Sequence, residues 1–142
     1  MKYIIVLFLL VSLAGCTSTT PVFYSDTKTI APYSAAVRTG STLYVSGQLG
    51  MNPETLELVA DDVEPQTKQV FANLQSVLAK AGYSLKDVVQ CTVYLKDIRD
   101  FKKMNDIYAT YFTAGSYPAR VALEVANLPK NAKVEIAAVA CT

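Results

Sequence analysis

Arg120 and Glu135 are the residues whose type and setting in this sequence point most directly to chemistry. Arg120 follows a Tyr-Pro-Ala turn and opens an apolar segment. Glu135 stands in a strand-like segment where Val134 and Ile136 point one way and Glu135 the other. A guanidinium among apolar neighbours either pairs with a structural carboxylate or binds an anionic ligand. A carboxylate there is either an ion-pair partner or a general base. Glu124 has a comparable setting, so the pattern alone does not single out Glu135.

Composition excludes several classes of function. The chain has 142 residues, 51% of them hydrophobic, a formal net charge of +1 and no His. Without His, neither a Ser-His-Asp triad nor a His-based metal site can form. The near-neutral charge argues against a general nucleic-acid binder, which normally carries a basic surplus. No P-loop, dinucleotide-binding or nucleophile-elbow motif is present. The length predicts one folded domain.

The first residues have the layout of an export signal. Lys2 precedes the apolar segment 3–11, and Leu-Ala-Gly-Cys follows at 13–16. This order of charge, short apolar run and small residues is typical of a signal peptide, and the tetrapeptide resembles a bacterial lipobox. The alternative is an ordinary N-terminal helix with a chance cysteine. The lipobox interpretation predicts a signal peptide over 1–15, lipidated Cys16 and a polar tether over 16–28. Thr17, in place of Asp, then favours the periplasmic face of the outer membrane if the source is Gram-negative.

Two further cysteines remain, Cys91 in an apolar strand-like run and Cys141 near the chain end. Their spacing fits neither a CxxC nor a zinc pattern. We expect two unreacted thiols rather than a disulfide, although export would permit oxidation.

The segment 29–142 is predicted to form the folded domain. Strand-like runs cover 36–37 with 43–45, 88–95, 120–125 and 133–140. Helical spacing predicts one amphipathic helix over 65–81, with Pro65 in its first turn and Gly82 after its end. A second helix is expected from an Asp100 cap to about Phe112. The order β-β-α-β-α-β-β favours an α+β fold, a mixed sheet with both helices packed on one face. The other face would still need cover, which makes self-association plausible.

Several segments together resemble the reactive-intermediate deaminase family, RidA/YjgF. The resemblance covers the chain from about residue 26 to its end. Its most specific parts are the P-A-R-x-x-x-x-V block at 118–125 and the L-P-K-x-x-x-V-E-I block at 128–136. Further similar stretches are Ile30 to Ala36, Leu43 to Gln48, and Asp97 to Tyr111 with Asn105. The leader departs from the familiar members, which are soluble. Ala137 also departs, because many members carry a second Glu there.

The resemblance implies a chorismate-mutase-like fold and a homotrimer with sites in the clefts between subunits. It implies hydrolysis of 2-imino acids, or their 2-enamine tautomers, to 2-oxo acids and ammonia. Matched residue by residue, Arg120 binds the substrate carboxylate and Glu135 orients or activates the attacking water. The Gly47 N–H and the Ala122 carbonyl contribute backbone contacts. The remaining pocket residues are Tyr33, Ser46 and Asn105.

These residue types suit that chemistry. A guanidinium fork binds a carboxylate in bidentate fashion, and an iminium is already electrophilic. Neither metal nor other cofactor is therefore expected. The main alternative is a non-catalytic module that binds a small carboxylate metabolite in the same cleft. A ribonuclease activity is disfavoured because the charge balance gives no basic surface for nucleic acid.

Overall fold

The computed structural model describes residues 19–25 and 31–142. Within them, one six-stranded sheet has the order β1-β2-β3-β6-β4-β5. Only β4 and β5 pair in parallel; the other neighbouring strands are antiparallel. The strands are β1 Val22–Tyr24, β2 Ala36–Thr39, β3 Thr42–Leu49, β4 Val88–Leu95, β5 Ala119–Glu124 and β6 Val134–Cys141.

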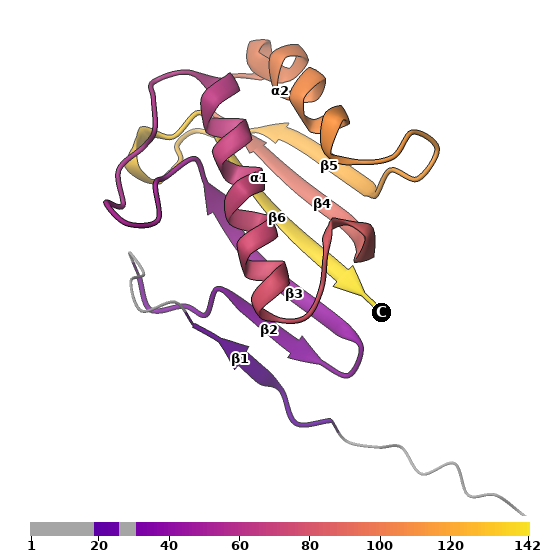
Figure 1. Cartoon of the computed structure of the whole chain (residues 1–142). Helices are drawn as coiled ribbons and strands as arrows, with labels where there is room; N and C mark the ends of the chain where they lie inside the picture. Colours follow the sequence, from indigo (N-terminus) through magenta and orange to yellow (C-terminus); the bar gives the residue numbers. More distant parts are fainter. Residues whose placement is uncertain (1–18, 26–30) are drawn as a thin grey trace, which may run out of the picture.

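Two α-helices of the described chain cover one face of this sheet (Figure 1). Helix α1, Val63–Lys80, begins at Asp62, whose side chain accepts the Glu64 N–H and so satisfies one free donor of the first turn. It ends before Gly82, which adopts a φ of +82° that glycine tolerates best. Helix α2, Phe101–Tyr108, is shorter. The mixed sheet with both helices on one face, predicted from the sequence, is confirmed.

Strand alternation places the core between the sheet and the helices. On β6, Val134, Ile136, Ala138 and Ala140 are buried, whereas Glu135 is only half-buried. Their partners from α1 include Phe71, with no exposed surface. The Glu135 side chain therefore projects from the face opposite the helices, as the period of two predicts.

Two local expectations need correction. Strand β1 lies inside the segment interpreted as a tether, because Val22 and its neighbours pair with β2. The polar composition around a three-residue strand hid it. The second helix does not extend to Phe112: α2 stops at Tyr108 and a 3₁₀ turn, Ala109–Tyr111, follows. Asp100 makes no side-chain cap, since the preceding 3₁₀ turn is capped by Asp97 through the Arg99 N–H.

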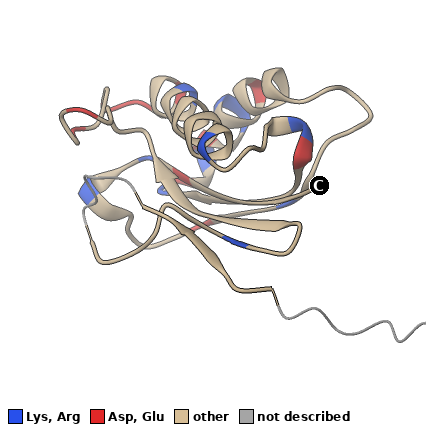
Figure 2. Cartoon of the chain, turned by 60° about the horizontal axis from the view of Figure 1, so that its bottom comes forward, with Lys and Arg blue, Asp and Glu red and all other residues tan. Residues whose placement is uncertain are grey.

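The sheet face away from the helices carries exposed apolar side chains. Tyr44 and Val121 are each 52% exposed, and Leu123 also lies open. Charged residues gather mainly on helices and loops, and the sheet is mostly uncharged (Figure 2). An exposed apolar face is typical of a surface that another protein copy covers. The homotrimer expected from the sequence stays a prediction.

The leader and Cys16 lie outside the described residues, so the signal-peptide interpretation stays a prediction. In residues 19–25 and 31–142, no helix combines the length and apolarity needed to cross a membrane. Cys91 is buried and Cys141 exposed, and both are free thiols, as expected.

Candidate functional site

Glu135 lies directly against Gly47. Gly47 falls in an irregularity of β3, between Val45 and Gln48, where the pairing register with β6 shifts. A Cβ atom at Gly47 would stand 1.9 Å from Glu135 Oε1 and 2.8 Å from its Cδ. The carboxylate therefore occupies the space that any larger residue at 47 would fill. The bulge and the glycine together place this carboxylate beside an irregular stretch of backbone, an arrangement common next to functional sites.

A cavity of about 290 Å³ opens beside this carboxylate. Four residues predicted from the sequence line it: Tyr33, Ser46, Gly47 and Glu135. The Ser46 hydroxyl donates to the Ser34 carbonyl at 2.7 Å. This bond uses the only donor of the Ser46 hydroxyl and ties β3 to the segment before β2. Towards a ligand the hydroxyl oxygen can therefore only accept a hydrogen bond.

Burial raises the pKa of Glu135 above its ordinary value. No hydrogen bond or ion pair to another described residue offsets this effect. The carboxylate is thus partly desolvated and unpaired within the described chain, and its raised pKa makes it a stronger base than an exposed glutamate.

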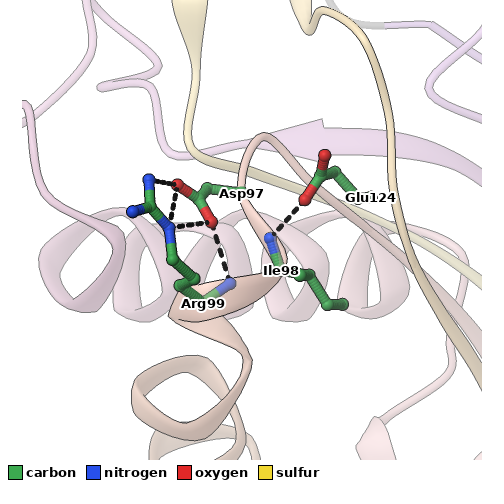
Figure 3. A network of polar contacts seen from close by, with 4 residues as sticks. All are labelled: Asp97, Ile98, Arg99 and Glu124. Atoms are coloured by element: carbon green, nitrogen blue, oxygen red, sulfur yellow. Dashed lines mark hydrogen bonds and ion pairs between the residues drawn. The ribbon is translucent and has the colours of Figure 1, made fainter.

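Glu124, the rival carboxylate in the sequence, has a structural task. Its Oε2 accepts the backbone N–H of Ile98 at 2.8 Å, next to the Asp97–Arg99 ion pair (Figure 3). This bond anchors the turn before α2 to the end of β5. The structure thus separates two glutamates that the sequence pattern left equivalent.

Arg120 lies on the edge strand β5 under α2. Its Nη2 donates to Asn105 Oδ1 at 2.8 Å, and its Cζ stands 4.4 Å from the centre of the Tyr108 ring. No carboxylate within the described residues pairs with it. Of the two interpretations of Arg120, the structural ion pair is therefore not found there, and the anion-binding role remains. Ala122 follows on the same face of β5 and packs against the core.

Arg120 and Glu135 project from opposite faces of the sheet. Residues directly across from each other on paired strands share a face. Arg120 pairs with Cys91, and Glu135 pairs with Tyr94. Cys91 and Tyr94 are an odd number of positions apart on β4, so their side chains point to opposite faces. We call Tyr33, Ser46, Gly47 and Glu135 the acid half-site, and Asn105, Arg120 and Ala122 the arginine half-site.

Sequence reasoning missed the residues that build the floor of the acid half-site. Asn73 on α1 donates from Nδ2 to the carbonyls of Leu49 and Met51, which holds the end of β3 against the helix. Gln69 in turn donates to Asn73. The sequence offered one signal for them: Gln69 and Asn73 are amide side chains four residues apart, beside the apolar positions of the predicted helix. The remaining unpredicted lining residues are Ala31, Gln48, Leu49, Met51 and Pro129.

A larger hollow of about 480 Å³ adjoins the acid half-site along α1 and shares Tyr33, Gln48, Met51 and Asn73 with it. Among the described residues, no three His, Cys, Asp or Glu side chains are grouped closely enough to hold a metal ion.

Comparison with known proteins gives consistent matches. Residues 24–142 match the family described as Endoribonuclease L-PSP. A RutC family protein of Pyrococcus horikoshii is 51% identical over 113 residues, 80% of this chain and 89% of that protein. A 2-iminobutanoate/2-iminopropanoate deaminase of Bos taurus is 48% identical over 111 residues, 78% of this chain and 80% of the enzyme. A crystal structure of a conserved Rid family protein of unknown function from Yersinia pestis superposes with a TM-score of 0.82 at 39% identity, covering 87% of this chain and all of that one.

Proposed function

The chain belongs to the RidA/YjgF family, the family described as Endoribonuclease L-PSP, and from this premise we propose that it hydrolyses 2-imino acids and their 2-enamine tautomers to 2-oxo acids and ammonia. The observation that carries the proposal is Glu135, a desolvated carboxylate without a partner among the described residues, held against Gly47 in a cavity. The deaminase of Bos taurus supports the chemistry at 48% identity.

A complete site needs two copies of the chain. Arg120 and Glu135 of one protomer project from opposite faces of the same sheet, so one small ligand does not reach both. We propose that a homotrimer joins the acid half-site of one protomer to the arginine half-site of its neighbour. The exposed apolar face of the sheet, with Tyr44, Val121 and Leu123, supports such association because its burial would be favourable.

In this site Arg120 binds the substrate carboxylate. Asn105 accepts one N–H of the guanidinium, and the outward N–H groups remain for two parallel bonds to the carboxylate oxygens. The bond fixes C2 of the iminium relative to Glu135. The Gly47 N–H and the Ala122 carbonyl hold the substrate and the water in place.

Glu135 then accepts a proton from the attacking water. The water oxygen bonds to C2 while the C=N π electrons move to nitrogen, giving a neutral carbinolamine at that carbon. Glu135 returns this proton to the amine nitrogen and then accepts the hydroxyl proton as the C–N bond breaks and the C=O bond forms. The leaving ammonia takes up that second proton as ammonium, which restores the Glu135 carboxylate. Such proton transfer contributes roughly 10²–10⁴-fold, and the fixed geometry adds a proximity effect.

A trapping assay tests the activity. An amino-acid oxidase generates 2-iminobutyrate in the presence of semicarbazide, and the protein is expected to suppress semicarbazone formation. Glu135→Gln should abolish suppression while 2-oxobutyrate still binds, whereas Arg120→Ala should abolish both. Arg99→Ala is the matched control, because Arg99 is paired with Asp97 at the surface. Wild-type protein that binds 2-oxobutyrate but gives no suppression would instead support the carboxylate-binding module.

We also propose that Cys16 is lipidated and anchors the protein in a bacterial envelope membrane. The family match begins at residue 24, so the lipobox-like Leu-Ala-Gly-Cys lies outside the segment that matches the family. Several acyl chains on one residue give stable attachment. Cys16→Ser should abolish labelling by a fatty-acid probe and leave the chain unprocessed or soluble; labelling equal to that of the wild type would contradict the anchor. Cys141→Ser is the matched control.

A further inference from the structure

One face of α2 forms a cradle for the Arg120 guanidinium. Phe101, Asn105 and Tyr108 follow each other at helical spacing, so they share that face. Arg120 Cζ lies 4.4 Å from the Tyr108 ring centre and 5.7 Å from that of Phe101. Asn105 accepts the Nη2 hydrogen bond at 2.8 Å. The guanidinium is thus held by one amide and two aromatic rings.

The Tyr108 ring itself cannot easily move. It is only 3% exposed. Phe71 of α1 meets it edge-on at 5.6 Å between ring centres, and Phe112 packs at 4.9 Å. Rings locked on two sides have fixed orientations, so Tyr108 transmits the rigidity of the core to the Arg120 side chain.

The Tyr108 hydroxyl does not explain the choice of this residue. It is buried and makes no hydrogen bond of normal geometry within the described chain, where the weakly polar Cys91 thiol lies near it. The neighbouring Cys91 thiol, across from Arg120 on β4, is also buried. Burial raises the pKa of Tyr108, and the nearby thiol adds to that rise. Both groups are therefore neutral, and the part of Tyr108 that acts on Arg120 is its ring.

We propose that Tyr108 is a positioning residue that orients Arg120 for the substrate carboxylate through the face of its ring. The kinetic consequence rests on the proposed imine hydrolysis. The attraction between a cation and a ring face depends on the electron density of the ring, and partly desolvated pairs are the stronger ones. Because the contact acts on carboxylate binding in both ground and transition states, its loss should change KM rather than kcat.

Steady-state kinetics of three variants test the proposal. Tyr108→Leu removes the ring and should raise KM about 3- to 30-fold, with kcat within about twofold. Tyr108→Phe keeps the ring face and should retain the wild-type KM. Tyr83→Leu is the matched control: Tyr83 is a buried aromatic residue whose hydroxyl donates to the Ser41 carbonyl at 3.0 Å, and within the described structure its ring contacts neither Arg120 nor the rings around Tyr108. This control should lower thermal stability and leave KM unchanged.

A fluorinated ring separates electrostatics from packing, should Tyr108→Leu fail to fold. Incorporating 3,4,5-trifluorophenylalanine at position 108 keeps the ring shape but withdraws electron density from its face. KM should rise relative to Tyr108→Phe at equal stability. An unchanged KM in this folded protein would overturn the proposal.

A spectroscopic readout tests the positioning without turnover. The Nε–H signal of Arg120, assigned by its loss in Arg120→Lys, should be displaced by the ring current of Tyr108. The displacement should persist in Tyr108→Phe and Tyr83→Leu and shrink clearly in Tyr108→Leu, where only the more distant Phe101 ring remains. The same signal position in Tyr108→Leu and wild type would refute the positioning role. Absence of imine hydrolysis with the displacement intact would refute the proposed function alone.

Discussion

Replacing Gly47 by alanine tests whether the Glu135 carboxylate must stay where the structure places it. The added Cβ would lie 1.9 Å from Glu135 Oε1. Ordinary carbon–oxygen contacts are about 3.3 Å or longer, so the oxygen must move by roughly 1.4 Å. The variant keeps the backbone N–H of residue 47. It therefore tests the space that Gly47 leaves for Glu135 independently of any hydrogen bond that this N–H donates.

We expect kcat/KM to fall about 100-fold, because displacing a catalytic group by about 1 Å costs that much. Stability should change by less than about 1 kcal/mol. Gly47 is not among the residues with positive φ, so alanine suits its backbone. The atom in the way is the end of a flexible side chain, whose shift to a poorer rotamer costs about 0.5–1.5 kcal/mol. The lower entropy of the unfolded alanine chain offsets part of this cost.

The assay is the semicarbazide trap with 2-iminobutyrate, run beside thermal unfolding. A Gly47→Ala protein with wild-type kcat/KM, in a preparation where Glu135→Gln is inactive, would refute the argument. It would mean that the position of the carboxylate in this structure is not the position it takes during turnover.

Four other outcomes follow from the structure. Gly50→Ala should lower the free energy of unfolding by about 1–3 kcal/mol, and with it the melting temperature. Its Cβ would lie 2.6 Å from the backbone Cα of Gln66, which cannot swing away. Activity should fall as pH drops through the raised pKa of Glu135, since the base becomes protonated. The ionised form of Glu135 also costs stability above that raised pKa, and the cost disappears below the ordinary glutamate pKa; Glu135→Gln should therefore melt higher than wild type near pH 8 and equally near pH 4. Glu124→Gln should retain full activity, because Glu124 accepts only the Ile98 N–H and an amide oxygen can do the same; a large loss of imine hydrolysis there would contradict the separation of the two glutamates.

The sequence determined much of the fold because local patterns were strong. The apolar period of α1, with Pro65 and Gly82 near its ends, and the alternation of β6 needed no distant contact to be recognised. The short strand β1 could not be recognised in this way. Three residues of a polar segment become a strand only because β2 presents a free edge to them.

The sequence likewise supplied the chemical types of the site, a guanidinium and a carboxylate on apolar strands. The alternation pattern alone could not distinguish Glu135 from Glu124, since both alternate with apolar neighbours; only the family resemblance singled out Glu135. Tertiary structure separates them: the Ile98 N–H, 26 residues away along the chain, reaches Glu124, whereas Gly47 leaves room for Glu135 beside a cavity. The structure alone also showed that Arg120 rests on Tyr108 and that it faces away from Glu135. Side-chain direction along one strand can be read from a period of two, but which strands become neighbours, and which helix covers them, depends on contacts between distant segments.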